Sequence, residues 1–127
     1  MKPADFRLRL HIHVGEAHSL GPGKAALLEA IQQTGSISAA ARALGMAYRH
    51  AWELVDDLNA CFAPGVVEAA PGGKEGGGAR LTPFGEELVK RFRAMEATAG
   101  AAIAPELAAL APELARNQRK RTRRRSA

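Results

Sequence analysis

The feature that most constrains the fold of this chain is the stretch GSISAAARALGMAYRHAWELVDDLN, residues 35–59. Small alanines dominate its first half, where Ser38 is placed to cap a short helix that ends at Leu44. Gly45 then stands where that helix has to end in a left-handed conformation. A second helix follows, and its apolar residues recur at helical spacing. They are Ala51, Leu54, Val55 and Leu58. The pattern predicts two helices joined by a tight turn.

Polar side chains gather at the start of the second predicted helix. Tyr48, Arg49 and His50 follow Ala47 directly and precede the apolar stripe. Polar residues at the N-terminal end of a helix, followed by an apolar stripe, are typical of a helix that enters a DNA groove by that end and packs on the protein by the stripe. Further along, Glu53 and the acidic residues after it would repel phosphate, so we expect only the N-terminal end to approach a duplex. The alternative is an exposed helix start without a role.

The flanking segments extend this bihelical core on both sides. Strict alternation over residues 6–14 predicts a half-buried strand, followed by a connector over residues 15–23. Apolar residues of one helical face, Ala26, Leu27, Ala30 and Ile31, then predict a helix that ends at Gly35.

The second half of the chain predicts a hairpin and more helix. Residues 66–69 and 80–82 are expected to pair as short strands around a glycine-rich tip at residues 71–79, which would form a wing. Thr82 is placed to cap a further helix that begins at Pro83. After Met95 the sequence becomes rich in alanine, and one or two short helices are expected from Pro105 and Pro112. We therefore expect a mainly α fold with a small β-sheet, a winged helix-turn-helix with a C-terminal helical extension.

Residues 20–97 resemble the N-terminal DNA-binding domain of ModE-type molybdate-responsive transcription regulators, which is related to the LysR-type winged helix. The resemblance is carried by the run from Tyr48 to Trp52, by the glycine-rich wing, and by the Leu-Thr-Pro-Phe-Gly-Glu transition after it. It implies a dimer that binds DNA. In that family a separate C-terminal domain binds molybdate, but the sequence after Met95 is too short to hold one. We therefore expect this chain to lack molybdate sensing of its own.

Nine residues are the candidates for contact with DNA. Arg49 could bond a guanine through two hydrogen bonds, and His50 could donate to a phosphate. Hydroxyls before the first helix could bring backbone N–H groups to phosphate, or could be plain helix caps. The candidates are Ser36, Ser38, Arg42, Ala47, Tyr48, Arg49 and His50, with Lys74 and Arg80 in the wing. Trp52 could touch the DNA backbone, although packing against the first helix of the pair is favoured.

Charge is distributed unevenly along the chain. Residues 116–127 hold seven of the 18 basic residues and none of the 13 acidic ones, so the rest carries a slight negative excess. We expect this basic tail to be disordered. Contact with DNA is slightly favoured over binding to an acidic partner or remaining free. The division expected is residues 1–97 for DNA binding, residues 98–115 as a helical extension that could dimerise, and the tail.

Three other sites were weighed against these. A nucleotide-binding loop is disfavoured, because the wing has no G-x-x-x-x-G-K-S/T pattern. His11 and His13 could share a metal, but an exposed polar strand face is favoured. Cys61 is expected to fill space rather than react, and as the single cysteine it suits a reducing cytoplasm. No signal core or membrane-spanning run is evident. We therefore expect no cofactor, no metal and no enzyme activity.

The function expected is a homodimeric, sequence-specific DNA-binding regulator. Dimer contacts are expected from Leu27, Leu28 and Ile31 on the first helix, and from an apolar stripe over residues 88–114. The alternative is an adaptor, which supplies DNA binding or docking to a separately encoded oxyanion-sensing protein.

Overall fold

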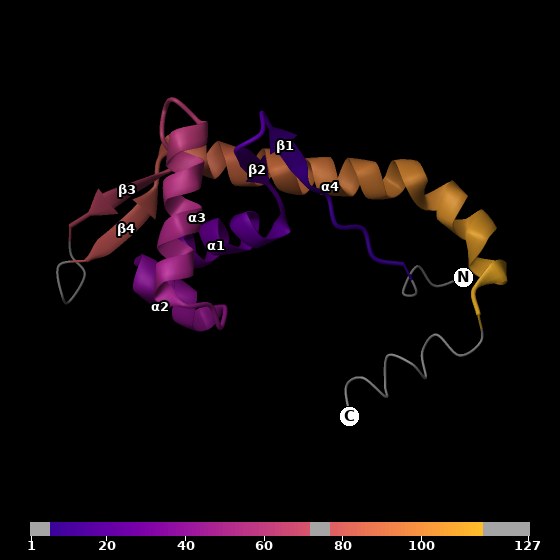
Figure 1. Cartoon of the computed structure of the whole chain (residues 1–127), viewed down its shortest axis with the longest axis horizontal. Coiled ribbons are helices and arrows are strands. Elements are labelled where there is room, and N and C mark those ends of the chain that lie inside the picture. Colours follow the sequence, from indigo (N-terminus) through magenta and orange to yellow (C-terminus); the bar gives the residue numbers. More distant parts are fainter. Residues whose placement is uncertain (1–5, 72–76, 116–127) are drawn as a thin grey trace. The chain divides into compact units, whose positions relative to one another are not determined.

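The computed structural model describes residues 6–71 and 77–115. Its elements are, in order, β1 (Ile12–Val14), β2 (His18–Leu20), α1 (Pro22–Thr34), α2 (Ile37–Ala43), α3 (Tyr48–Cys61), β3 (Val67–Ala70), β4 (Gly78–Leu81), α4 (Pro83–Leu110) and the 3-10 helix η2 (Ala111–Glu113) (Figure 1). Residues 9–96 form one compact unit, while residues 6–8 and 97–115 fall in a second. The predicted mainly α architecture, a winged helix-turn-helix with a C-terminal helix, is confirmed.

The core of the first unit lies where α1, α2 and α3 meet, and the beginning of α4 closes it. The largest fully buried side chains include Leu27, Leu28 and Ile31 of α1, Leu58 of α3, and Phe92 of α4. Full burial of one such side chain stabilises the fold by about 1.5–3 kcal/mol. The expectation that Leu27, Leu28 and Ile31 contact a second subunit is wrong, because each is 0% exposed within its own chain.

The N-terminal strand is much shorter than predicted. Only Ile12–Val14 is strand, and it pairs antiparallel with β2, a strand that the sequence pattern did not predict. The turn between them begins at Gly15, whose φ is 62°. β1 is short because a strand needs a hydrogen-bonded neighbour, and the three residues of β2 pair only with Ile12–Val14. Leu10 and Ile12 still pack against the core, whereas Leu8 is exposed.

The second hairpin, β3–β4, forms the predicted root of the wing. Val67 lies opposite Leu81, and Ala70 lies opposite Gly78. The two hairpins lie on opposite sides of α3 (Figure 1). Ala79 donates its backbone N–H to the carbonyl of Gly35 at 2.9 Å, which ties β4 to the turn between α1 and α2.

Helix α4 begins as predicted but ends later than predicted. The hydroxyl of Thr82 accepts the N–H of Gly85 at 2.9 Å and donates to the carbonyl of Gly65, also at 2.9 Å. A separate helix from Pro105 is not observed, because α4 continues through Pro105 to Leu110. At Pro112 the chain forms only the short 3-10 helix η2. Alanine has the highest helix propensity of all residues, and the alanine-rich run carries the helix past the proline.

An ion-pair cluster joins α1 to α4 within the first unit. Arg93 contacts Glu29 of α1 at 2.6 Å and Glu96 of its own helix at 2.7 Å. The hydrogen bonds that Arg93 donates to the Glu29 carboxylate, and then the one that it donates to Glu96, raise the pKa of Arg93 above its ordinary value. Across residues 6–71 and 77–115, no helix combines the length and the apolar character needed to cross a bilayer.

Candidate nucleic-acid interface

The turn between α2 and α3 is held by backbone hydrogen bonds around one glycine. Gly45 has a φ of 65°, as expected for a residue that ends a helix in the left-handed region. Met46 donates its N–H to the carbonyl of Ala41 at 2.9 Å, and its side chain packs against the core. Ala47 is extended, with φ −63° and ψ 140°, and serves as the N-cap of α3. This geometry fixes the direction in which α3 leaves the turn.

Helix α3 is buried on one side and free at its N-terminal end. Ala51, Val55 and Leu58 are buried, which confirms the predicted apolar stripe. By contrast, Tyr48, Arg49 and His50 are exposed at the start of the helix. His50 lies 3.8 Å from Glu53, one turn further along. The structure therefore leaves the three side chains at the head of α3 accessible to a partner.

Helix α2 places two hydroxyls and one cation beside that head. The expectation that Ser38 caps the helix is wrong: Ser36 is the cap, and its hydroxyl accepts the N–H of Ala39 at 2.9 Å. Ser38 lies inside the helix, where its hydroxyl accepts a hydrogen bond from Arg42 at 2.9 Å. A cap has to be extended, and Ser36 is extended (φ −154°, ψ 151°) because the chain has just left α1.

The root of the wing carries an ion pair. Arg80 of β4 bonds the carboxylate of Glu68 on β3 at 2.8 Å, across the register of the hairpin, and both side chains are exposed. The Arg80 charge is therefore partly neutralised where the sequence had suggested a free cation. Lys74, the other candidate in the wing, lies outside the described residues.

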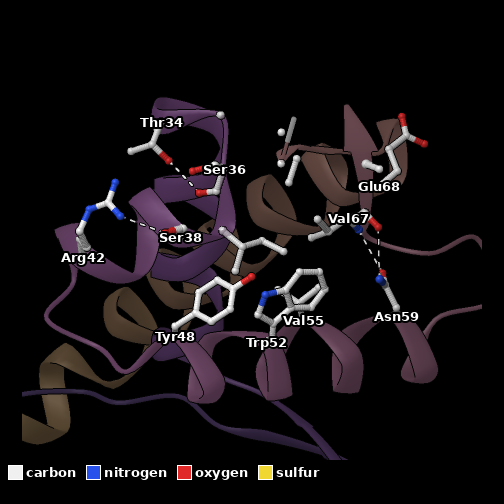
Figure 2. Close-up of a pocket in the computed structure, with 16 residues that line it drawn as sticks. Thr34, Ser36, Ser38, Arg42, Tyr48, Trp52, Val55, Asn59, Val67 and Glu68 are labelled. Atoms are coloured by element: carbon white, nitrogen blue, oxygen red, sulfur yellow. Dashed lines mark hydrogen bonds between the residues drawn. The ribbon is translucent and has the colours of Figure 1, made fainter. Parts of the chain in front are cut away.

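A hollow of about 850 Å³ separates the helix-turn-helix from the β3–β4 hairpin. Tyr48 and Trp52 of α3 form one wall, with their rings edge to face and 6.2 Å between centroids. Figure 2 shows both rings directed into this space, with Ser36, Ser38 and Arg42 along one side and Val67 and Glu68 along the other. Trp52, which was expected to pack against α2, is 40% exposed, so its indole ring is only partly covered by the protein.

Asn59 is a residue of this region that sequence reasoning missed. Its side-chain oxygen accepts the N–H groups of Val66 and Val67 at 2.7 and 3.0 Å, and its amide donates to the carbonyl of Val67 at 3.2 Å. These bonds fasten β3 to the end of α3 and so set the position of the wing root relative to the helix. An asparagine near a helix end has many uses, so no local signal could have identified this one.

Asp57 joins α3 to the opposite hairpin. It bonds His18 of β2 at 2.6 Å, and it also bonds Lys24 of α1, whose ammonium group donates to the carbonyl of Ser19 at 2.6 Å. The hydrogen bond from Lys24 is the main reason why the pKa of Asp57 lies below its ordinary value, and the bond from His18 adds to it. The acidic charge expected to repel phosphate is thus largely compensated at this position.

The described residues contain no cluster of three or more His, Cys, Asp or Glu side chains that could hold a metal ion. His11 and His13 are exposed, and the ring of His11 lies close to the backbone of Gly21. Cys61 is a half-buried free thiol at the last residue of α3.

No family model matches the chain, but the chain is similar to several bacterial proteins whose names refer to molybdenum or to ModE. The molybdenum-pterin-binding protein MopB of Rhodobacter capsulatus is 55% identical over 78 residues, which are 61% of this chain and 29% of MopB. The transcriptional regulator ModE of Yersinia pestis is 46% identical over 71 residues, 56% of this chain and 27% of that protein.

A longer match is found with the molybdenum transport protein ModE of Azotobacter vinelandii. It is 36% identical over 96 residues, which are 76% of this chain and 36% of that protein. The chain thus spans about a third of the length of the relatives that it matches. Over this region the chain is a ModE-type winged helix-turn-helix domain, homologous to part of the ModE and Mop proteins.

Proposed function

We propose that this chain is a sequence-specific DNA-binding transcription regulator whose reading element is the N-terminal end of α3. The observation that carries the proposal is the exposed head of α3 beside a wing, on a helix whose other side is buried. Relatives named as ModE regulators support it. What those regulators bind is not carried over to this chain. The experiment described below tests whether molybdate affects DNA binding by this chain.

Specificity is assigned to Arg49 and His50. An arginine at the start of a helix in the major groove can bond a guanine through two hydrogen bonds, which discriminates by about 1–3 kcal/mol against other bases. His50 would donate to a base or a phosphate, and Tyr48 would touch a phosphate or a thymine methyl group. The remaining candidates, Ser36, Ser38, Arg42, Ala47, Lys74 and Arg80, would contact the sugar-phosphate backbone and hold the register.

The proposal divides the chain at residue 97. Residues 1–97 would bind DNA, residues 98–115 would form the extension, and the basic tail of residues 116–127, which lies outside the described residues, would add nonspecific attraction to phosphate. The activity requires access to the chromosome and thus places the protein in the cytoplasm. The single Cys61, which has no other cysteine to pair with, agrees with that compartment.

Dimerisation is proposed through the extension. Ile103, Leu107 and Leu110 recur at helical spacing in the second half of α4, and Leu110 is 56% exposed. A two-fold dimer would present two α3 heads to successive major grooves of a symmetric operator. Sedimentation analysis of Leu110→Asp tests this: the variant should become monomeric, whereas Leu44→Asp, at another exposed leucine, should leave the mass unchanged.

The main experiment is selection of genomic fragments by the purified protein, with and without molybdate. It would yield a binding site, its symmetry and any effector response together. Arg49→Ala should then weaken binding to the selected site by about 1–3 kcal/mol while leaving the fold intact. Arg91→Ala removes an equal charge from an exposed position of α4 and serves as the control. Equal affinity for the selected site and for random duplex at physiological salt would refute the proposal.

A second proposal is an adaptor that supplies DNA binding or docking to a separately encoded oxyanion-sensing protein. The observation that favours it is the slight negative excess of residues 1–115, with 11 basic against 13 acidic side chains, which permits docking to another protein. Co-purification with such a sensor, and a molybdate response only in its presence, would support the adaptor. A molybdate response by the purified chain alone would contradict it.

A further inference from the structure

Trp52 lies next to the residues proposed to contact DNA but has no role in the proposed function. It is the only tryptophan, and it is 40% exposed although indole rings usually contribute to burial. It stands one helical turn after Tyr48, which is 55% exposed, and the two rings form a continuous aromatic wall. Exposed aromatic rings that lie side by side and face a hollow are typical of a surface that receives a partner.

The opposite sides of the hollow indicate the kind of partner. Arg42 and Glu68 are the charged residues among the described lining, and the Glu68 carboxylate is partly neutralised by its ion pair with Arg80. The hydroxyls of Ser36 and Ser38 accept hydrogen bonds from Ala39 and Arg42, and each O–H can still donate to a phosphate oxygen. The described lining thus combines one free cation, one carboxylate paired with Arg80, serine hydroxyls, an indole N–H, a phenol and apolar ring faces. This set suits a strand that alternates apolar sugars with anionic phosphates.

The position of the hollow indicates which part of a bound duplex would occupy it. The hollow begins at Tyr48, the residue next to Arg49, and it ends at the β3–β4 hairpin. A duplex whose major groove receives the head of α3 would therefore pass one of its two backbones between α3 and the wing root. Tyr48 and Trp52 lie one turn apart along α3, so they would follow that backbone.

We propose that the Tyr48–Trp52 wall binds one sugar-phosphate strand of the duplex, with the indole ring against deoxyribose and the indole N–H donating to a phosphate oxygen. The inference rests on the proposed function, since it needs a duplex on the α3 head. It makes Trp52 a DNA-contacting residue that positions the reading head, in addition to the nine candidates derived from the sequence.

Trp52 also provides its own probe. The full chain is titrated with a selected duplex while tryptophan emission and the anisotropy of labelled DNA are recorded in parallel. The emission should change and should saturate at the same DNA concentration as the anisotropy. In the anisotropy assay, Trp52→Ala should raise Kd about 3- to 10-fold, the scale of one lost hydrogen bond, and Trp52→Phe, which keeps a ring against the sugar, should raise it less.

A matched control and a salt series distinguish this contact from a general loss of stability or charge. Met95→Ala removes a side chain of similar exposure, 39%, from α4 and should change Kd less than twofold. Because Trp52→Ala removes no charge, the slope of log Kd against log salt should match that of the unmodified chain. Circular dichroism checks that both Trp52 variants keep the helical content of the unmodified chain.

The possible failures are distinguishable. If the selected duplex binds while tryptophan emission stays constant and Trp52→Ala binds within twofold of the unmodified chain, this inference is overturned and the proposed function stands. If no duplex binds, both fall. If the emission responds to a protein partner and not to DNA, the hollow is a protein-docking surface and the inference is again wrong.

Discussion

Replacing Asn59 tests whether one side chain holds the wing root against α3. Asn59→Ala removes an acceptor that serves the N–H groups of Val66 and Val67, and a donor that serves the carbonyl of Val67. Each hydrogen bond contributes about 0.5–1.5 kcal/mol net, so the three together contribute about 3 kcal/mol. Alanine is a better helix former than asparagine by about 0.6 kcal/mol, which offsets part of the loss. We expect a net loss of about 2 kcal/mol in the free energy of unfolding.

The measurement is urea unfolding followed by far-ultraviolet circular dichroism. Asn59→Ala should lower the midpoint without changing the slope, because the surface exposed on unfolding stays the same. Asn59→Asp keeps the shared acceptor for both N–H groups and loses only the 3.2 Å donation, so it should lose about 1 kcal/mol. Asp56→Ala, at an exposed position of the same helix, is the control. A free energy of unfolding for Asn59→Ala within 0.5 kcal/mol of the unmodified chain, roughly the effect of an ordinary surface substitution, would refute the reasoning.

Three further predictions concern the same unit, each measured by denaturant unfolding. Leu58→Ala should lose about 2–5 kcal/mol, because a fully buried side chain leaves a cavity; a smaller loss would mean that the site collapses. Asp57→Asn should lose about 1–2 kcal/mol at neutral pH. Since the pKa of Asp57 is lowered from 3.8, its contribution is present above that pH and is lost as the pH falls below it, so the variant and the unmodified chain should converge in acid. Gly85→Ala should destabilise the wing root despite a better helix former, because its Cβ would lie 2.2 Å from the carbonyl oxygen of Val66; unchanged stability would contradict this.

Local patterns predicted the helices of the first unit because each pattern specifies a backbone period or a chain reversal. Gly35 and Gly45 end α1 and α2 with the expected left-handed geometry, and Thr82 caps α4 at Pro83. The β3–β4 hairpin was also predicted to within two residues at each strand end, since a glycine-rich tip between two apolar runs leaves few other pairings.

Side-chain surroundings were harder to predict from the same residues. The amphipathic pattern of α1 indicates that Leu27 and Ile31 are buried. It does not indicate whether the residues that bury them belong to the same chain or to a second subunit. Ser36 and Ser38 are both suitable caps, and the direction in which the chain leaves α1 selects Ser36. No periodicity connects Asn59 to Val66, because the contact depends on how β3 returns to α3.

The sequence by itself determined the order of elements from α1 to the start of α4, the corner at Gly45 and the polar head of α3, because these follow from interactions between near neighbours along the chain. Only the tertiary structure decided the length of β1, the exposure of Trp52, the pairing of Arg80 with Glu68 and the anchoring of Asp57 by Lys24. Each of these depends on which segments meet after folding, and segments distant in sequence are brought together by packing of the whole core rather than by any local preference.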